Sequence, residues 1–328
     1  MADALIVNCS PTAKSLPIRV GLREGIFARY GIDLRLVSAD SSREQRSGLA
    51  RGDFHVVHVA VDNAIAMREV DKLDVVVFIG GDSGMNELFV QSDIGSIAEI
   101  QGGRLVVDAP DTAFALQAYK ILEDHGLARG RDYQVIAVGR GELRIEAMRA
   151  DKANTAAILN LPYSLEARRL GLRSLGDTTQ FIGPYQAGSA FAMRAWAEVH
   201  RDQLIRYIAA YLEGLRRVLD PRNHQACAEI LVEDLGTERD IANETVELLR
   251  RPGFGLHPEA AIDEAGLRNT IALRASQQAG SRLGDPQEYI DLSYYAAALA
   301  LAKPKTSQFR NSISADRRST THRAEDGV

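Results

Sequence analysis

The sequence predicts an α/β fold of two lobes. Apolar, strand-like runs alternate with amphipathic helical segments, which is typical of mostly parallel sheets. This alternation starts again after the glycine pair Gly102-Gly103, where a second sheet is expected to begin. The chain has 328 residues, which is longer than the roughly 250–300 residues at which single hydrophobic cores stop growing. We therefore expect two α/β lobes followed by a C-terminal helical segment.

The first lobe is predicted to begin with a short strand. Residues 5–7 are apolar, and the apolar spacing over residues 16–30 predicts an amphipathic helix that Gly31 stops. Alternating apolar and charged side chains over residues 32–37 predict the next strand. The elements that follow are expected to be a helix at 42–50, a buried strand at 54–60, a helix from Asp62 and a buried strand at 75–79.

The chain is expected to pass between the lobes twice. Residues 87–91 predict a strand that crosses into the second lobe, and residues 186–193 predict one that crosses back. Between these crossings we expect strands at 104–107, 133–138, 155–159 and 173–176, with helices near 112–125, 142–150 and 162–170. Leucine and isoleucine at helical spacing over residues 200–219 then predict a long helix that ends at Asp220-Pro221.

These elements divide the chain into three parts. The first lobe is expected to comprise residues 1–87 and 190–302, and the second lobe, with the crossings, residues 88–189. Residues 303–328 are rich in Ser, Thr, Arg and Asp and have only Phe309 and Ile313 as sizeable apolar side chains. Such a composition cannot bury enough apolar surface to fold, so this tail is expected to be disordered.

Two segments near the N-terminus carry a family resemblance. The first reads REGIFARYGIDLRL over residues 23–36, and the second reads LARGDFHVVHV over residues 49–59. In this spacing of helix, glycine stop, strand, helix, Gly-Asp turn and strand, the chain resembles the solute-binding proteins of ABC importers for nitrate, alkanesulfonates and taurine, and the related thiamine-pyrimidine precursor proteins. The resemblance implies a periplasmic-binding-protein-like fold of type II, with two crossover strands and a small-molecule ligand between the lobes. It also implies an ABC permease as a partner.

Ligands of open α/β sheets bind at the loops that follow the carboxyl ends of strands. Seven positions match the family's ligand-contact loops, namely Ser10, Thr12, Asp62, Asn63, Ser83, Thr112 and Asn160. The helix N-termini expected at Asp62 and Thr112 would together favour a small anion, because each presents free N–H groups. We therefore expect a small organic ligand that is anionic or heteroaromatic.

Several of these positions also have a purely structural interpretation. Asp62 and Asp111 lie at expected N-cap positions of helices. For both residues, N-capping is favoured over ligand contact by about two to one. Ser10 and Thr12 would close a turn, and the Thr112 hydroxyl has nearly equal weight in either role. A buried carboxylate at the mouth of the cleft would instead favour an amine-bearing ligand.

Other function classes find little support in the sequence. A net charge of −5 gives no general attraction to nucleic acid, and the chain lacks the roughly 18 consecutive apolar residues of a membrane-spanning helix. His55 and His58, three apart on a strand, point to opposite faces, which disfavours a metal pair. The glycine pairs match no nucleotide-binding loop, and Cys9 is the single candidate nucleophile. We expect no metal, no cofactor and no catalytic residue.

Three functions remain open at this point. The first is a solute-binding protein. The second is a cytoplasmic enzyme on the same fold, acting in pyrimidine-precursor synthesis or in decarboxylation or hydrolysis of a small aromatic acid, and the third is an intracellular ligand sensor. The opening residues 1–4 lack the basic and apolar regions of an export signal. The location is therefore expected to be periplasmic if a leader precedes this sequence, and cytoplasmic if the chain is complete as given.

Overall fold

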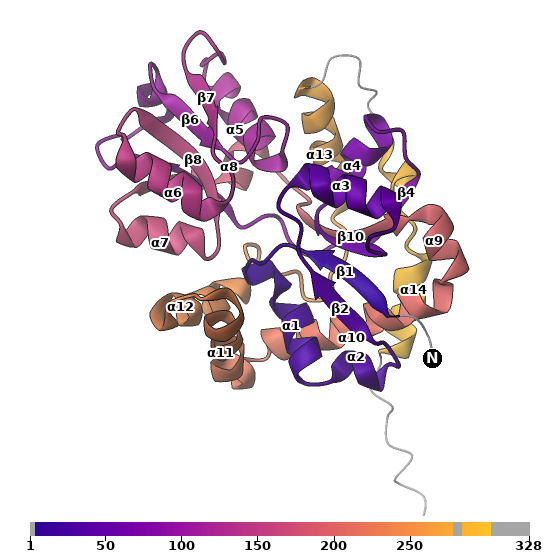
Figure 1. Ribbon diagram of the computed structural model, residues 1–328. Helices are drawn as coiled ribbons and strands as arrows, with labels where there is room; N and C mark the ends of the chain where they lie inside the picture. The colour runs from indigo at the N-terminus through magenta and orange to yellow at the C-terminus, as the bar shows by residue number, and fades with distance from the viewer. Residues whose placement is uncertain (1–3, 278–283, 303–328) are drawn as a thin grey trace, which may run out of the picture.

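Two mixed β-sheets, each of five strands, form the framework of the computed structural model, which describes residues 4–277 and 284–302. Figure 1 shows the two sheets in separate lobes, with helices packed on both faces of each sheet. This arrangement confirms the α/β fold of two lobes that the sequence predicts. The tail expected to be disordered, residues 303–328, lies outside the described residues.

The sheet of the first lobe has the strand order β2-β1-β3-β10-β4. Its strands are β1 (Leu5–Cys9), β2 (Leu34–Val37), β3 (Val56–Ala60), β4 (Val75–Ile79) and β10 (Gly188–Met193). β1 pairs in parallel with β2 and β3, whereas β10 returns from the second lobe and runs antiparallel to β3 and β4. The carboxyl ends of β1 to β4 therefore meet at one edge of this sheet.

The sheet of the second lobe has the strand order β7-β6-β8-β5-β9. Its strands are β5 (Asn86–Val90), β6 (Arg104–Val107), β7 (Gln134–Ala137), β8 (Asn154–Asn160) and β9 (Arg173–Asp177). β6 is parallel to β7 and β8, and the crossover strand β5 is antiparallel to β8 and β9. The strands of the two sheets agree with the predicted lobe limits to within two residues, and we keep those limits as a proposal.

The prediction of a single helix over residues 16–30 was wrong. The structure has two helices there, α1 (Leu16–Arg23) and α2 (Ile26–Arg29). Gly25 between them has a φ of +66°, a left-handed conformation that glycine adopts without the steric cost of a Cβ. The helix therefore breaks at Gly25, and the apolar spacing continues across the break because both helices pack on the same core.

The remaining helices divide between the two lobes. The second lobe holds η2 (Ile97–Ile100), α5 (Ala113–Asp124), α6 (Gly141–Ala150), α7 (Tyr163–Arg169) and α8 (Thr178–Ile182). The others are η1 (Ala13–Ser15), α3 (Ser42–Arg51), α4 (Asp62–Glu69), α9 (Arg194–Val199), α10 (Arg201–Leu219), η3 (Pro221–Asn223), α11 (His224–Leu235), α12 (Arg239–Leu249), α13 (Glu264–Gln277), η4 (Pro286–Glu288) and α14 (Ser293–Leu301). Among the described helices, none combines the length and the apolar character needed to cross a membrane.

Separate hydrophobic clusters hold these layers together. On one face of the first sheet the buried side chains come largely from α1 and α10, and on the other face from α3 and α4. α10 approaches α1 so closely that a Cβ on Gly214 would collide with the carbonyl oxygen of Pro17. The second sheet has α5 on one face and α6 with α7 on the other. This packing leaves the loops at the carboxyl edges of both sheets free to approach one another.

Candidate functional site

Arg274 of α13 makes polar contacts that join the two lobes. Its guanidinium holds both carboxylate oxygens of Asp62, with N···O distances of 2.6 and 2.6 Å, and it also donates to the backbone carbonyl of Asp111 at 2.7 Å. Asp62 belongs to the first lobe and Asp111 to the loop after β6 in the second. Asp62 and Arg274 are only 3% and 5% exposed. The loops after β3 and β6 are therefore bound together through one arginine.

This contact changes the interpretation of Asp62. The N-cap of α4 is Val61, and no side chain caps that helix. The capping role weighed for Asp62 is therefore wrong, and its carboxylate is instead neutralised by Arg274. A carboxylate that already accepts two hydrogen bonds from a guanidinium no longer selects for an amine-bearing ligand by its charge.

Thr112 does cap its helix. It is the N-cap of α5, and its hydroxyl oxygen accepts a long bond from the N–H of Ala115 at 3.5 Å. The same hydroxyl donates to Asp108 at 2.5 Å. Thr112 is buried, and the structural interpretation holds for it. It still stands at the mouth of the second lobe, where the first N–H groups of α5 are directed.

The other predicted residues of the first lobe lie in the loops after β1, β3 and β4. The hydroxyl of Ser10 accepts from Gln45 at 3.2 Å, and the backbone N–H of Thr12 bonds the carbonyl of Ser10 at 2.8 Å, so this loop is the turn that the sequence suggests. The amide oxygen of Asn63 accepts a long bond from Arg46 at 3.5 Å. Ser83 is half-buried in the loop after β4.

Lys14 and Asp82 join two of these loops. The Lys14 ammonium lies 2.9 Å from the Asp82 carboxylate, which also accepts from the N–H of Gly84 at 2.7 Å. The carbonyl of Asp82 receives the N–H groups of Ala187 and Gly188, at the point where the chain returns from the second lobe. Asp82 therefore ties the loops after β1 and β4 to the crossing that leads into β10.

His58 and Cys9 are paired residues on neighbouring strands β3 and β1. Burial lowers the pKa of His58 to about 4, and its ring shares a 3.2 Å hydrogen bond with the Tyr207 hydroxyl and packs on Tyr211. Burial raises the pKa of the Cys9 thiol to about 12. At neutral pH both groups are uncharged, so the pair does not form the thiolate and imidazolium that a nucleophilic cysteine requires.

The carboxyl edge of the second sheet carries a buried cation that the sequence did not reveal. Arg144 of α6 is 3% exposed and donates to the carbonyl of Ile158 in β8 at 2.5 Å. Its guanidinium carbon lies 4.6 Å from the centre of the Phe114 ring. Desolvation by burial lowers the pKa of Arg144, and nearby Asp108 opposes that shift. Asn160, at the end of β8, is also buried at this edge.

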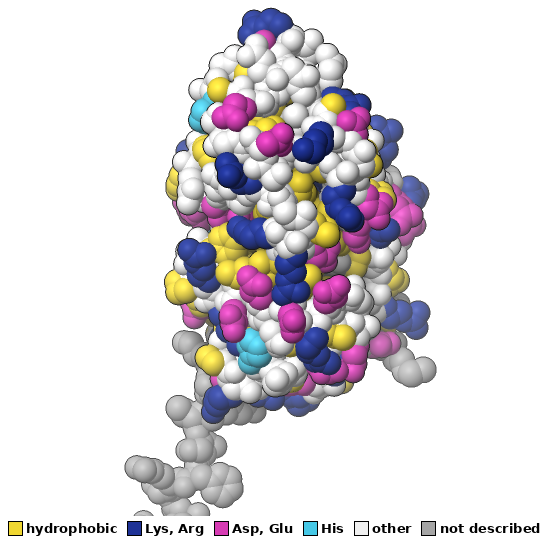
Figure 2. Space-filling model, turned by 90° about the vertical axis from the view of Figure 1, so that its left-hand side faces the viewer, with side chains coloured by type: hydrophobic (Ala, Val, Ile, Leu, Met, Phe, Trp, Pro, Cys, Tyr) yellow, Lys and Arg dark blue, Asp and Glu magenta, His cyan; other side chains and the backbone are white. Residues whose placement is uncertain are grey.

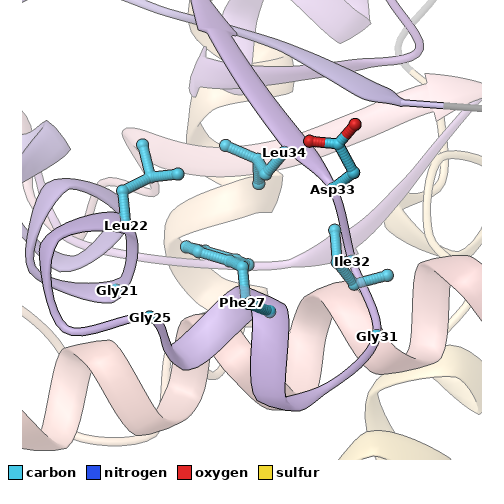
Figure 3. Close-up of a pocket in the computed structure, with 9 residues that line it drawn as sticks. Gly21, Leu22, Gly25, Phe27, Gly31, Ile32, Asp33 and Leu34 are labelled. Carbon is cyan, nitrogen blue, oxygen red and sulfur yellow. The ribbon is translucent and has the colours of Figure 1, made fainter.

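Two cavities accompany these contacts. The larger, of about 420 Å³, lies at the amino end of β2 and is lined largely by apolar side chains and glycines. Figure 3 shows Leu22, Phe27 and Leu34 around it, with the Asp33 carboxylate at its rim. This is the edge of the sheet opposite to the ligand-binding edge of α/β folds. The smaller cavity, of about 150 Å³, lies between the lobes and is lined by Arg46, Pro110, Asp111, Arg129, Arg274 and Gln277, among others.

The lobes also approach each other on a second side. Arg169 of α7 lies 3.8 Å from Glu238, the residue that precedes α12. Figure 2 shows the molecule from this side, with hydrophobic and basic side chains gathered along the waist between the second lobe and the helices below it. The two lobes therefore touch on both sides of the facing sheet edges. On one side α13 contacts α5, and on the other side α7 contacts α12.

The structure brings six of the seven predicted residues into two groups, and Asn160 lies apart from both. Arg274 contacts Asp62, and Arg46 contacts Asn63. Both arginines also contact Asp111, which precedes Thr112, so Asp62 and Asn63 lie near Thr112. Ser10, Thr12 and Ser83 belong to the loops that Lys14 and Asp82 join, and Asn160 lies at the edge of the second sheet. The sequence missed Arg274, Arg144 and the Lys14–Asp82 pair. Their partners are far away along the chain, so no local pattern marks them.

Comparison with known proteins identifies a matching family and several similar structures. The sequence model of the NMT1-like family matches residues 5–232, and no curated protein matches this chain. A solved structure of a protein from Bordetella bronchiseptica RB50 is similar, with a TM-score of 0.78 at 18% identity, over 91% of this chain and 97% of that one.

Two transport-related structures are also similar. The periplasmic nitrate-binding protein NrtA of Synechocystis PCC 6803 has a TM-score of 0.74 at 12% identity, over 92% of this chain and 89% of that one. The periplasmic aliphatic sulphonate binding protein SsuA of Escherichia coli has a TM-score of 0.67 at 15% identity, over 84% and 86%. At these identities the likeness shows the shared two-lobed fold.

Proposed function

This chain belongs to the NMT1-like family, and from that premise we propose that it is a solute-binding protein. It encloses a small organic ligand, anionic or heteroaromatic, between its two lobes, as the binding proteins of ABC importers for sulfonates, nitrate and taurine do. An ABC permease is the proposed partner and the periplasm the proposed location. The ligand is expected to contact Ser10, Thr12, Asn63, Ser83, Thr112 and Asn160, with Asp62 held beside them by Arg274.

The observation that carries this proposal is the contact of Arg274 with both lobes. The guanidinium binds Asp62 of the first lobe and the Asp111 carbonyl of the second, next to the N-terminus of α5. A ligand that also touches both edges adds to the same closed arrangement, and so ligand affinity and closure are linked. The loops after β1, β3, β4, β6 and β8 supply the polar groups for such a ligand.

Charge supports an anionic ligand over a cationic one. The buried acids Asp62 and Asp82 are already neutralised by Arg274 and Lys14. The N-terminus of α5 presents free N–H groups and a partial positive charge at the mouth of the second lobe. The ligand-binding edge of the first sheet therefore has its two buried acids, Asp62 and Asp82, already paired with cations, and the N-terminus of α5 offers donors to an anion.

A thermal-shift screen tests the proposal. Nitrate, alkanesulfonates, small carboxylates, aminopyrimidines and aromatic acids are compared at equal ionic strength, because a ligand present at 100 times its dissociation constant stabilises the folded state by about 2.7 kcal/mol. We expect one class to raise the melting temperature. If no class does, the proposal of a small ligand between the lobes is rejected.

Two matched substitutions locate the site once a class responds. Ser83→Ala and Asn160→Ala are expected to weaken binding by calorimetry, while Ser92→Ala, an exposed serine in the same region of the chain, leaves it unchanged. Each lost hydrogen bond to a charged ligand group is expected to cost about 1.5–3 kcal/mol. Equal affinities for all three variants would place the ligand elsewhere. Activity assays with the same compounds test the enzymatic alternative directly.

A further inference from the structure

Arg144 is a buried cation whose charge no neighbouring carboxylate neutralises directly. Its side chain donates to one backbone carbonyl, that of Ile158, and its Nε is buried without a hydrogen-bond partner among the described residues. No carboxylate oxygen in the described part of the chain lies within the 4.0 Å that defines an ion pair. Burying a charge without a partner is unfavourable, and buried charges in proteins are almost always paired.

Asp108 is the acid whose charge acts most strongly on Arg144. It accepts the Thr112 hydroxyl at 2.5 Å, and desolvation raises its pKa, although Arg144 acts in the opposite direction. Asp108 thus influences Arg144 electrostatically without closing an ion pair with it. The guanidinium carbon lies over the ring of Phe114, 4.6 Å from its centre, a cation–π contact.

The place of Arg144 in the fold is that of a ligand-binding group. Its contacts come from β8 through Ile158 and from the first turn of α5 through Phe114. Asp108, which follows β6, lies next to it. These segments form the carboxyl edge of the second sheet, where ligands of α/β folds bind. The buried acids Asp62 and Asp82 at the edge of the first sheet form ion pairs, whereas Arg144 on the second lobe forms none among the described residues.

We propose that Arg144 binds the oxyanion of the ligand and so fixes the ligand's acidic end on the second lobe. This inference rests on the proposed function and specifies its ligand as a small organic acid, with a carboxylate or sulfonate group that a guanidinium recognises through paired N–H donors. The remainder of the ligand then faces the loops after β1 and β4 in the first lobe. Arg144 thereby sets both the charge specificity and the orientation of the ligand.

The alternative is that Arg144 serves only to hold β8 against α5. The two roles predict opposite effects on the ligand-free protein. If Arg144 is kept for binding, replacing it with methionine, an uncharged side chain, removes a buried cation that forms no ion pair among the described residues and whose Nε has no hydrogen-bond partner there. Arg144→Met should then unfold at the same temperature as the wild type or higher. If Arg144 is structural, the variant should unfold at a lower temperature.

Arg274→Met is the matched control for this measurement. It removes a similarly buried arginine that forms an ion pair, and it leaves the carboxylate of Asp62 without its cationic partner. The control is expected to lower the unfolding temperature. If Arg144→Met lowers it as much as Arg274→Met does, the binding role of Arg144 is overturned.

Binding of charged and neutral probe pairs provides the second test. The probes are acetate with acetamide, and methanesulfonate with methanesulfonamide, followed by ligand-observed NMR. The wild type should bind each anion at least about tenfold more tightly than its neutral partner, as hydrogen bonds to charged groups allow. Arg144→Met should abolish that preference, and Arg140→Met, at an exposed arginine preceding the same helix, should retain it.

The outcomes separate this inference from the proposed function. If the wild type binds members of the screening panel but shows no preference for anions, the role of Arg144 is rejected and solute binding stands. If Arg144→Met keeps a preference equal to that of the wild type, the assignment also fails. If the wild type binds neither the panel nor the probes, the proposed function itself is rejected.

Discussion

The buried pair of Asp62 and Arg274 should dominate the response of the fold to single substitutions. Two N···O contacts of 2.6 Å join groups that are 3% and 5% exposed. Two unit charges about 4 Å apart attract one another by about 4 kcal/mol at the effective dielectric constant of partly buried protein sites. Removing one partner leaves the other charged and desolvated, which costs about 3–5 kcal/mol. We expect Asp62→Ala and Arg274→Ala each to destabilise the protein by that amount.

The expected shift in melting temperature follows from the size of the chain. Unfolding entropies of about 2.1 cal/mol/K per residue give roughly 0.6 kcal/mol/K for the two lobes together, so each single substitution should lower the melting temperature by about 5–8 °C. Urea unfolding followed by far-UV circular dichroism measures the same loss as a free energy. Lys120→Ala serves as a control, because it breaks the more exposed i, i+4 pair with Asp124 and should cost below about 0.5 kcal/mol.

A double substitution tests whether the loss of stability comes from a buried charge left without its partner. Asp62→Leu with Arg274→Met removes both charges and fills similar volume, so most of the lost stability should return. The reasoning is refuted if either single substitution costs less than about 1 kcal/mol, or if the double variant is as unstable as the sum of the two single variants. Such a result would mean that the pair is solvated or that its packing, rather than its charge, carries the stability.

Three further predictions concern groups away from this pair. Because the pKa of His58 is about 4 in the folded protein and 6.5 as its reference value, the unfolded state binds more protons between these values. Stability should therefore fall by about 3 kcal/mol as pH is lowered from 6.5 to 4, and His58→Phe should flatten that part of the urea-unfolding profile. The buried thiols of Cys9 and Cys227, with pKa values raised to about 12 and about 11, should react with iodoacetamide at pH 8 only after unfolding, and rapid labelling of the native protein by mass spectrometry would contradict their burial. Gly214→Ala should lower the melting temperature, at a cost of about 1–3 kcal/mol, because the added methyl group meets the Pro17 carbonyl, and an unchanged melting temperature would show that α10 can shift.

The elements that the sequence predicted well are those with a strong local pattern. The buried runs of β3 and β4 and the long apolar stripe of α10 appear close to their expected limits. Local periodicity also placed the loops at Ser10, Asp62 and Thr112 after strands and before helices. The break between α1 and α2 was missed, since the apolar spacing of the two helices is continuous and only the left-handed φ of Gly25 separates them.

The roles of the site residues could not be obtained in the same way. Whether Asp62 caps a helix, binds a ligand or pairs with a cation depends on which group lies beside it, and that group is Arg274, 212 positions along the chain. The same holds for Lys14 with Asp82 and for Arg144, whose hydrogen bond joins α6 to Ile158 of β8. The sequence favoured capping for Asp62 and Asp111, and both predictions were wrong, because the N-caps of α4 and α5 are Val61 and Thr112.

The amino-acid sequence by itself determined that this protein has two α/β lobes, that the chain passes between them twice, and that polar loops gather at the carboxyl ends of the strands. These features follow from side-chain periodicity and turn residues, which act over a few positions. Tertiary structure alone decided which buried charges form ion pairs and which do not. Pairing and desolvation depend on distances of a few ångströms between residues that are remote in the chain, and those distances exist only once both sheets and α13 have packed together.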